Sequence, residues 1–493
     1  MITSAELRNL SHAIKAEVET EVAVIGGGTS GFIAAVAAAM SGARATLVEY
    51  LPYLSGTHGG AGLVLSGTGF YHTYLGDRRY KHQNEADLVV GGLAMAYWKR
   101  LVRAGAAYGT EDAAPLNIIN DPELTKVVTE AMVVEAGVDV WLMSQFVEAV
   151  VDDGALSGVL ISRGGGLWYL KTKVVVDASG DGVVSDQAGA PFEIGRASDG
   201  LPQAGTMFFE MGGVDIEKTL DHLKEHPDHF AETHYGFPPS ADYLLAGMKG
   251  GNPVRFKVRC GYDEALSKGE LPTVVGGTGY PPALGSIYLH WKGGRVVSNM
   301  VSINMDMIYG LDPTNRDLYD DLLIEGKRFV LAVVDHYRRY VPGFENSWLS
   351  CFPTLLGIRE GRRIVGDHMI SESDVIEGST FPDAIGRCGA FLDVHGEDIE
   401  AKLDHREVGG EKGWFHVPYR SLLPKGVEGL LLAGKLISAD HLAHGSIRNQ
   451  VICMMTGHAA GTAAALSARE HVAPRRLPVQ ELQSLLREQH AII

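Results

Sequence analysis

The chain has 493 residues, 45% of them hydrophobic and 21% charged, and this length indicates two domains rather than one. Its formal net charge of −17 disfavours nucleic acid and anionic membranes as partners, because phosphate-rich surfaces attract basic proteins. Glycine is frequent, with 61 residues, as expected for a fold whose backbone approaches a large ligand closely.

The cysteines and the apolar segments indicate a protein of a reducing compartment. The four cysteines lie far apart and form neither a disulfide framework nor a zinc-binding spacing. The N-terminal stretch contains no apolar signal segment, and the most apolar run, "GFIAAVAAAM", is too short to span a bilayer. We therefore expect a cytoplasmic protein that does not bind membranes.

The first predicted elements form a strand–turn–helix–strand unit. "EVAVIG" is a short buried strand, "TSGFIAAVAAAMSG" an alanine-rich helix, and "RATLVEY" a second strand. The turn before the helix contains Gly26, Gly28 and Gly31 in the pattern G-x-G-x-x-G, and Glu49 lies at the end of the second strand. This arrangement is typical of a dinucleotide site, because the glycines admit a pyrophosphate to the helix N-terminus and the carboxylate accepts the ribose hydroxyls.

The next elements are two helices and a series of strands. Residues 85–105 have helical periodicity, and residues 121–137 open on an N-cap Asp and a proline and close on glycine. Strands follow, with hairpin turns at 153–154 and 164–166. We assign all of these elements to a first cofactor-binding segment, residues 1–206.

The middle of the chain changes character. From 207 to 342 it contains glycine- and proline-rich strands and one long helix at 316–340, which indicates an inserted domain that faces the substrate. Residues 343–493 return to strand, loop and helix. The predicted fold class is therefore α/β: a discontinuous Rossmann-type cofactor domain with an inserted β-rich α+β substrate or cap domain.

The glycine turn alone does not distinguish NAD from FAD, but two later segments favour FAD. "KVVVDASGDG" is a buried strand that runs into a polar glycine turn, which suits a second approach to a long dinucleotide. In "LLLAGKLISADHLAHGSIRNQ", a helix starting near Gly445-Ser446-Ile447 would direct N–H groups at the part of a flavin that becomes negative on reduction. The expected FAD contacts are Gly26, Gly28, Ser30, Gly31, Glu49, His58, Val147, Asp177, Gly180, Asp181, Gly434, Ser446, Ile447 and Arg448.

Several stretches together resemble the FAD-dependent oxidoreductase family of the glutathione-reductase-like superfamily, which is related to the fumarate reductase and succinate dehydrogenase flavoproteins. They include "VAVIGGGTSG", "VVVDASGDGVVSDQAGAPF", "VPYRSLLPKGVEGLLLAGKLISADHLAHGSIR" and "MTGHAAGTAAAL", and they lie within residues 20–205 and 345–490. The resemblance implies a two-domain flavoenzyme with FAD bound across the first domain. It does not imply a substrate, since one fold and cofactor serve many reactions.

Three histidines are candidates for proton transfer, since flavin oxidation of a C–H bond needs a base and the reverse reaction needs an acid. "SADHLAHGSIR" places His441, His444 and Arg448 around the expected flavin-facing turn; each histidine would act on substrate or brace the loop, and the arginine would hold the flavin or cap the loop. Asp393 and His395 would lie on one face of a strand and form a base with its orienting carboxylate, or else belong to a solvated turn.

Candidates for substrate binding are two arginines and one histidine. Arg359 and Arg363 are four residues apart, so one face of a helix would present both to a substrate carboxylate or a pyrophosphate; an ion-pair cluster between the domains explains them equally well. His72, in "FYHTYLGD", would line the substrate site. We expect no metal, because the histidines considered as ligands do not converge: His72, His395, His416, His441, His444 and His458.

His58 is the least usual residue of the first unit. It lies nine residues after Glu49 and directly before two glycines, in "LSGTHGGAGL". Because the fumarate reductase branch bonds a histidine of this region covalently to the flavin, the resemblance implies that His58 is a candidate for such a bond. The chain departs here from the usual pattern of the FAD-dependent oxidoreductase family, so a non-covalent flavin contact and a structural turn histidine stay open.

The sequence as a whole predicts an FAD-dependent dehydrogenase or oxidase that transfers a hydride from a small polar organic substrate to flavin N5. The alternatives are a fumarate-reductase-like ene-reductase and a flavoprotein electron-transfer subunit of a larger complex. A homo-oligomer is open, and the sequence does not specify the electron acceptor.

Overall fold

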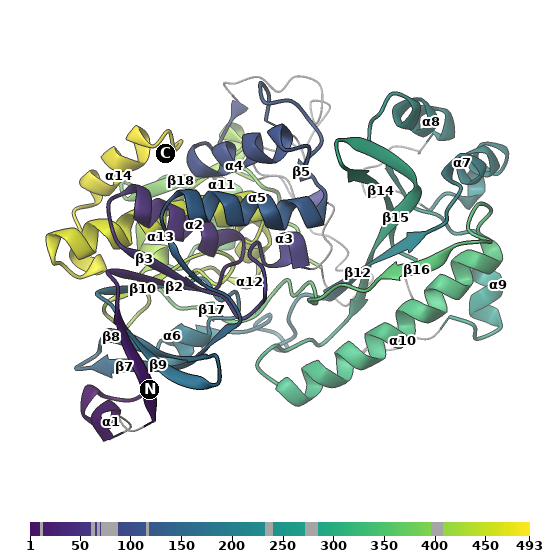
Figure 1. The fold of residues 1–493 in the computed structure, drawn as a ribbon. Coiled ribbons are helices and arrows are strands. Elements are labelled where there is room, and N and C mark those ends of the chain that lie inside the picture. Colours follow the sequence, from purple (N-terminus) through teal and green to yellow (C-terminus); the bar gives the residue numbers. More distant parts are fainter. Residues whose placement is uncertain are drawn as a thin grey trace.

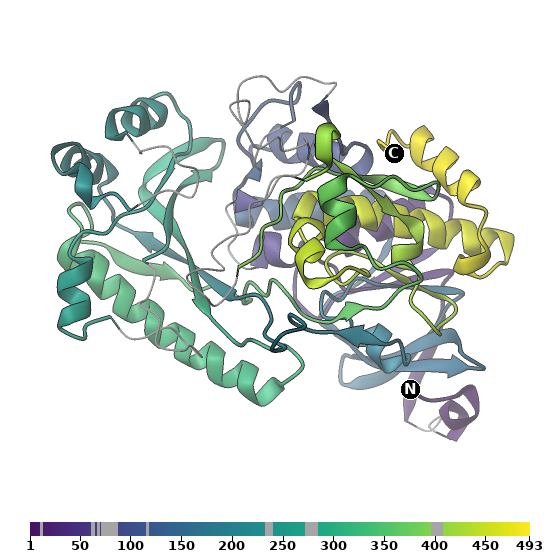
Figure 2. The same ribbon diagram turned by 180° about the vertical axis from the view of Figure 1, so that it is seen from behind.

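Two lobes make up the computed structural model, one built around a parallel sheet and the other around an antiparallel sheet (Figure 1). Both ends of the chain lie in the first lobe, so an interior part of the sequence forms the second, as the view from behind also shows (Figure 2). The structure describes residues 1–9, 13–60, 65–66, 70, 87–114, 118–231, 240–271, 284–395 and 408–493.

The parallel sheet has the Rossmann-type arrangement that the glycine turn predicts. In spatial order its strands are β20 (Leu430–Leu432), β10 (Val174–Asp177), β2 (Val22–Ile25), β3 (Ala45–Val48) and β6 (Asp139–Trp141). All neighbours pair in parallel, so their carboxyl ends meet at one edge. Every residue of β2, β3 and β10 is buried, which explains why these strands are continuous apolar runs.

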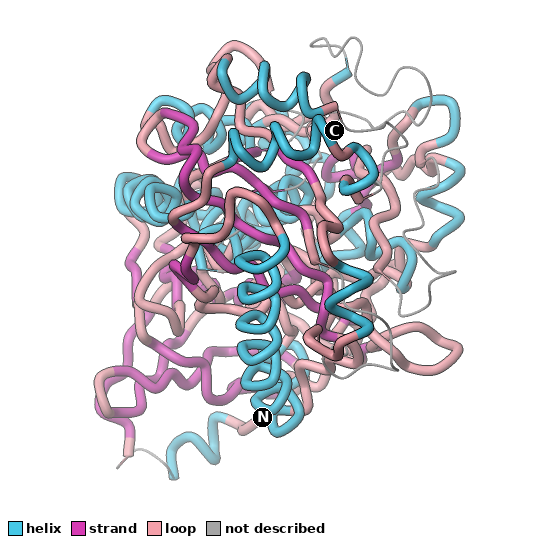
Figure 3. The backbone as a smooth tube through the Cα atoms, turned by 90° about the vertical axis from the view of Figure 1, so that its right-hand side faces the viewer, coloured by secondary structure: helices cyan, strands magenta, loops and turns pink. Residues whose placement is uncertain are grey.

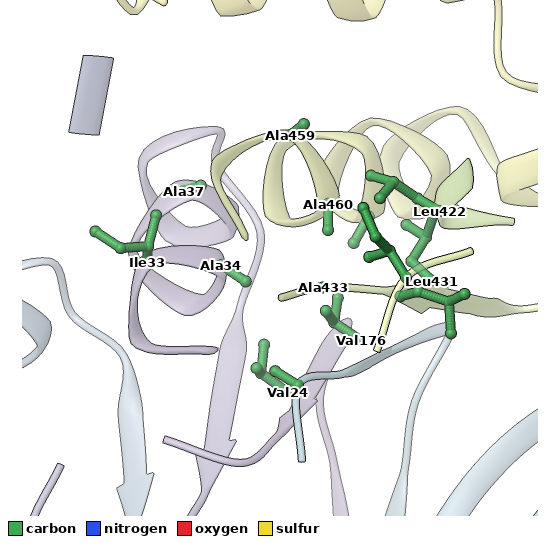
Figure 4. Packing of buried hydrophobic residues seen from close by; sticks show 14 of the residues in the cluster. Val24, Ile33, Ala34, Ala37, Val176, Leu422, Leu431, Ala433, Ala459 and Ala460 are labelled. Atoms are coloured by element: carbon green, nitrogen blue, oxygen red, sulfur yellow. The ribbon is translucent and has the colours of Figure 1, made fainter. Parts of the chain in front are cut away.

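Two helices pack closely on this sheet, α2 (Thr29–Met40) and α13 (Gln450–Glu470). A Cβ atom at Gly461 of α13 would lie 2.0 Å from the carbonyl oxygen of Ala34 in α2, so glycine is what lets the two backbones touch. Figure 4 shows alanines of both helices above the valines and leucines of the sheet. Among the described residues, α13 alone is long and apolar enough to cross a membrane, and its apolar window is completely buried inside the molecule.

A second, four-stranded sheet completes the first lobe, with tight turns at 153–154 and 164–166 as predicted. Its strands are β1 (Ile14–Glu19), β9 (Gly166–Lys171), β8 (Ala155–Arg163) and β7 (Ser144–Asp152). The remaining described helices of this lobe are α1 (Ser4–Asn9), α3 (Thr57–Gly60), α4 (Gly92–Arg103), α5 (Pro122–Glu135), α6 (Val183–Gln187), α11 (Glu372–Glu377), α12 (His441–Ile447) and α14 (Val479–Glu488), with the 3-10 helices η3 (Gly410–Lys412), η4 (Tyr419–Leu422) and η5 (Pro474–Arg476). Short paired strands are β4 (Leu65–Ser66), β5 (Ile118–Ile119), β11 (Phe192–Glu193), β17 (Arg363–Ile364), β18 (Ala384–Cys388) and β19 (Phe415–Pro418).

The second lobe has its own hydrophobic core, which extends from Met207 to Leu356 and therefore past residue 342. Figure 3 looks at this lobe end-on and separates its strands and helices by colour. In spatial order its antiparallel strands are β13 (Arg255–Phe256), β14 (Ser286–Lys292), β15 (Arg295–Ile308), β12 (Gly205–Gly212) and β16 (Trp348–Cys351). Its helices are α7 (Ile216–Glu225), the 3-10 helix η2 (Pro227–His229), α8 (Ala241–Lys249), α9 (Tyr262–Ser267) and α10 (Arg316–Tyr340).

The helices that the sequence predicts from capping residues are present in the structure. The helix that was predicted only from the spacing of two arginines is not. Asp121 caps α5 by accepting the N–H of Glu123, and α10 spans the predicted 316–340. The predicted helix through Arg359 and Arg363 is wrong, because residues 352–362, all of them described, form neither helix nor strand and β17 begins at Arg363. Their four-residue spacing therefore carries no meaning.

Candidate active site at the strand ends

The glycine turn at the end of β2 is held by backbone contacts within the chain. Gly26 has φ +100°, and a Cβ atom there would lie 2.4 Å from the carbonyl oxygen of Ala178. A Cβ atom at Gly31 would lie 1.7 Å from the carbonyl oxygen of Gly26. These two glycines are needed to join the turn to β10 and to bring α2 onto the sheet.

Gly28 differs, because the protein leaves space for its side chain. A Cβ atom at Gly28 would meet nothing nearer than the Cα of Gly56, at 3.9 Å. Beside it, Ser55 has φ +83° and is fully buried, and its Oγ has no hydrogen-bond partner among the described residues. The glycine-lined space between Gly28 and Gly56, at the N-terminus of α2, is a cradle that fits the pyrophosphate of FAD.

Glu49 lies where a ribose-binding carboxylate is expected, at the end of β3. It is 3% exposed, and its carboxylate accepts the N–H of Gly27 at 2.6 Å and that of Leu51 at 2.8 Å. Burial raises its pKa, although the backbone N–H groups work in the opposite direction. The carboxylate is thus fixed beside the glycine turn before any ligand binds.

The two aspartates predicted to contact FAD in the turn after β10, Asp177 and Asp181, have different surroundings. Asp177 is fully buried, and its carboxylate accepts the N–H and the hydroxyl of both Ser179 and Ser185, so it organises the turn. Asp181 is partly exposed at the tip, next to Gly180, and forms an ion pair with Lys435 at 3.2 Å. Sequence reasoning missed Lys435, although it directly follows Gly434, just past the end of β20.

The other predicted FAD contacts are spread more widely. The hydroxyl of Ser30 donates to the carbonyl of Ala433, which ties α2 to the end of β20, and Val147 is 41% exposed on β7. Ser446 and Ile447 are buried in the last turn of α12. The predicted helix start at these residues is wrong, because the long helix begins at Gln450 after a turn.

A buried carboxylate, Glu360, is the centre of the catalytic candidates. It is 0% exposed, accepts the backbone N–H of Gln203 at 2.9 Å, and pairs with the guanidinium of Arg363. Its carboxylate also lies 3.0 Å from Nδ1 of His441. Sequence reasoning missed Glu360 as a site residue, because "REGRR" resembles any solvated charge cluster when burial is unknown.

The ring of His441 is oriented by this carboxylate, while burial and nearby cations favour its neutral form. Burial, followed by the nearby charges of Arg363 and Arg196, lowers its pKa to about 4. Because a carboxylate only accepts, Nδ1 carries the proton toward Glu360 and Nε2 keeps its lone pair. The side chain is 14% exposed, so this lone pair lies at the edge of the buried network.

His444 is placed differently, since both of its ring nitrogens have protein partners. Nε2 lies 3.0 Å from the carbonyl oxygen of Lys435 and Nδ1 lies 3.3 Å from the amide nitrogen of Gln203. The ring is fully buried, and burial holds its pKa well below the ordinary value. These contacts are those of a loop brace.

His395 belongs to a second cluster, which like the first consists of a carboxylate, an arginine and a histidine. Its Nε2 lies 3.0 Å from the carboxylate of Asp393, which also receives the guanidinium of Arg448 at 2.7 Å. The residues form a loop rather than the expected strand, but the pair exists. Burial alone would raise the pKa of Asp393, yet the charges of His395 and Arg448 hold it below its usual range.

One short segment joins the two clusters. Gln203 donates to Glu360, and the N–H of Ala204 donates to the carbonyl of His395 at 3.1 Å. Arg359 donates to the carbonyl of Ala204 at 2.5 Å. The amide oxygen of Gln203 is buried and has no hydrogen-bond partner among the described residues. Candidates from four distant parts of the sequence therefore meet where the chain passes from the first lobe to the second.

The two predicted substrate arginines do not share a role. Arg363 is 3% exposed and donates to the carbonyls of Gly195 and Ala439 besides pairing with Glu360, so its charge is used inside the protein. Arg359 is half-buried and lies closer to the edge of the cluster. The third substrate candidate, His72, lies outside the described residues.

His58 lies in α3 with its side chain fully buried. Its ring is edge-on to the ring of Tyr97, with 6.1 Å between ring centres. Burial lowers its pKa to about 4, and a hydrogen bond with Asn120 opposes part of this shift. The ring is therefore enclosed between α3, α4 and the start of α5.

Comparisons with known proteins cover nearly the whole chain. The profile of the family described as "FAD dependent oxidoreductase" matches residues 21–486. A search of the curated proteins finds no match. Similar solved structures include a geranylgeranyl bacteriochlorophyll reductase-like protein from Thermoplasma acidophilum, with 14% identity, a TM-score of 0.41, and coverage of 96% of this chain and 84% of that chain. L-proline dehydrogenase from P. horikoshii is 12% identical, with a TM-score of 0.36 and coverage of 96% and 99%.

Proposed function

The chain belongs to the FAD-dependent oxidoreductase family, and on that premise we propose that it oxidises a small polar organic molecule with His441 as the base. FAD is the cofactor, and when bound it supplies the hydride acceptor. The protein's own residues then have three tasks: to hold the substrate, to remove a proton from its O–H or N–H group, and to exclude water.

The pair formed by His441 and Glu360 is the observation that carries this proposal. The buried carboxylate fixes the imidazole in the tautomer whose Nε2 accepts a proton, and it stabilises the cation formed afterwards. Arg363 balances the charge of Glu360, so the carboxylate is not an isolated buried charge while His441 is neutral. Removing the base lowers the rate of flavin reduction by about 10²–10⁴-fold.

The pairing of His441 with Glu360 supports a role as base, since the carboxylate orients the ring and stabilises the imidazolium that forms on proton transfer. His395 is the second candidate, since its carboxylate partner Asp393 orients it in the same way. Arg359, half-buried beside the same segment, is the candidate anchor for a substrate carboxylate.

The cofactor is held without a covalent bond in this proposal. A bond to the flavin requires an imidazole nitrogen at the surface of the cofactor site, and the side chain of His58 is fully buried against Tyr97. Acid precipitation of the yellow protein is therefore expected to release all of its colour into the supernatant. A yellow pellet that becomes colourless in His58→Gln would instead establish the covalent link.

The direct test is an anaerobic screen in which flavin absorbance reports reduction by small alcohols, amines and hydroxy acids. An active compound is expected to bleach the wild type rapidly and His441→Gln about 10²–10⁴-fold more slowly. His471→Asn, a change at an exposed histidine, is the matched control and should behave as the wild type. Equal rates in wild type and His441→Gln would exclude His441 as the base. Reduction only by a partner protein would favour the electron-transfer alternative.

A further inference from the structure

A cluster of metal-ligating side chains lies in the second lobe, apart from the flavin site. His222 is on α7, His229 ends η2, and Cys260 lies just before α9. Nε2 of His222 is 2.9 Å from Nδ1 of His229, and one ligand atom from each of the three side chains lies within 4.8 Å of the other two. We propose that these three side chains bind one transition-metal ion of the Zn²⁺ type.

The distances are close to those of a tetrahedral site. Zinc bonds of about 2.0–2.1 Å to nitrogen and about 2.3 Å to sulfur put neighbouring ligand atoms about 3.3–3.6 Å apart. The observed separations, from 2.9 Å to at most 4.8 Å, bracket this range. Small side-chain rotations of the three residues are enough to bring all three atoms onto one ion.

The backbone brings two of the ligands together without help from an ion. Phe230 and Val258 form an antiparallel bridge, and the residue before Cys260 donates its N–H to the carbonyl of His229 at 2.9 Å. The carboxylate of Asp228 lies 3.9 Å from Nε2 of His229, the ring nitrogen that does not face His222. This distance is too long for a hydrogen bond, so the exposed carboxylate contributes only charge attraction to an ion at this site.

Burial and chemistry narrow the choice of ion. Cys260 is 1% exposed, whereas His222 and His229 are half-buried, so an ion enters from the histidine side and meets the sulfur last. Binding exchanges the proton of the thiol for the ion: an S–H bond breaks, an S–metal bond forms, and one proton leaves to water. Thiolate and imidazole ligands together select zinc over magnesium and calcium.

A hydrogen bond between His222 and His229 explains part of the cluster without an ion. His226 stacks on the ring of His229, with 5.3 Å between ring centres, and lies tilted against His222 at 4.5 Å, which extends this imidazole group. That hydrogen bond does not involve the Cys260 sulfur, which belongs to the core of the second lobe and approaches the two histidines from that side. The expectation of no metal from the sequence rested on histidines elsewhere and did not weigh this trio.

The position of the cluster indicates a structural site. α7 and α9 lie at the end of the second lobe that is remote from α2 and α13, and both views agree on this (Figures 1 and 2). An ion there would link His222 of α7 and His229 of η2 to Cys260, just before α9, so all of its protein ligands belong to one lobe. Its loss should therefore reduce the stability of this lobe and leave flavin binding intact.

The test is to measure bound zinc in the intact flavoprotein after removal of loosely held metal and addition of Zn²⁺. One Zn²⁺ per chain is expected in the wild type, and less than about a tenth of that in Cys260→Ala and His229→Gln. Cys351→Ser, a change at an exposed cysteine of the same lobe, is the matched control and should keep its zinc.

A second measurement needs no variant and so does not depend on variant folding. Co²⁺ added to the metal-free wild type should produce the strong d–d bands of a tetrahedral site with a thiolate ligand, at longer wavelengths than the flavin absorbs. Wild type that binds no more Zn²⁺ than Cys260→Ala and gives no such bands would overturn the proposal. Zinc bound equally by wild type and Cys260→Ala would place it elsewhere, which also rejects this site.

Discussion

The first lobe packs backbone against backbone, whereas the second packs side chain against side chain. Residues 451–468 of α13 are buried on every side, and glycines bring the helix into contact with α2. In the second lobe, α10 buries one face through large side chains such as Phe329 and Tyr337. Backbone contact leaves little freedom for substitution, so the first lobe can be recognised from the sequence more easily than the second.

The largest effect on stability is expected from a comparison of substitutions at two glycines of the same turn, Gly31 and Gly28. Gly31→Ala should destabilise the protein by about 4 kcal/mol or more, because its Cβ would lie 1.7 Å from the carbonyl oxygen of Gly26. Gly28→Ala should fold normally yet bind FAD poorly, because its Cβ meets no described protein atom nearer than 3.9 Å and would occupy the pyrophosphate cradle. Unfolding of the FAD-free proteins in urea and titration with FAD separate the two effects. Normal FAD binding by Gly28→Ala would reject the cradle.

The next prediction tests whether His441, which lies where the chain passes from the first lobe to the second, acts as the base. A base acts only when neutral, so kcat/KM should rise with pH through about 4, the pKa to which burial lowers His441, and stay level above it. An acid of the same pKa would give the opposite profile, with activity lost above about pH 4. His441→Gln should lose this limb along with about 10²–10⁴-fold in rate. A pH profile over the stable range, with the substrate found in the screen, distinguishes the cases.

A smaller effect concerns the buried histidine of the first lobe. Burial lowers the pKa of His58 to about 4 in the folded state, while the unfolded chain titrates near 6.5, so the unfolded state takes up the proton first as pH falls. The stability due to neutral His58 is complete above pH 6.5 and is lost toward pH 4. In His58→Gln the loss of unfolding free energy between about pH 7 and pH 5 should therefore shrink by about 2 kcal/mol. His471→Asn should leave the wild-type pH dependence unchanged, and an unchanged dependence in His58→Gln would contradict the burial of a neutral ring.

The smallest effects use one helix cap in each lobe. Asp121→Ala removes the cap of α5 and Asn315→Ala removes that of α10, each at about 1 kcal/mol. If the lobes unfold together, both substitutions lower one common Tm. If they unfold separately, Asp121→Ala shifts the transition in which FAD is released and Asn315→Ala shifts the other. Calorimetry with flavin fluorescence as a second signal decides between these outcomes.

The sequence predicted the strand–turn–helix–strand geometry of the glycine turn well, because each of its constraints is local. Gly26, Gly31 and Glu49 act within one strand–turn–helix–strand unit, so their spacing alone carries the information. The caps of α5 and α10 are equally local. The prediction failed for Arg359 and Arg363, because a four-residue spacing has meaning only if the segment is a helix.

The rest was decided by contacts between segments far apart in the sequence. Glu360 becomes the partner of His441 only because residues 352–362 pass beside the loop after β20. Cys260 approaches the two histidines of its cluster only because a backbone bridge joins their segments. The sequence by itself determined the cofactor family and the geometry of the glycine turn, since the glycines act on neighbouring residues. Only the tertiary structure decided which carboxylate pairs with His441 and which cysteine approaches His222 and His229, because burial and convergence depend on how distant segments pack.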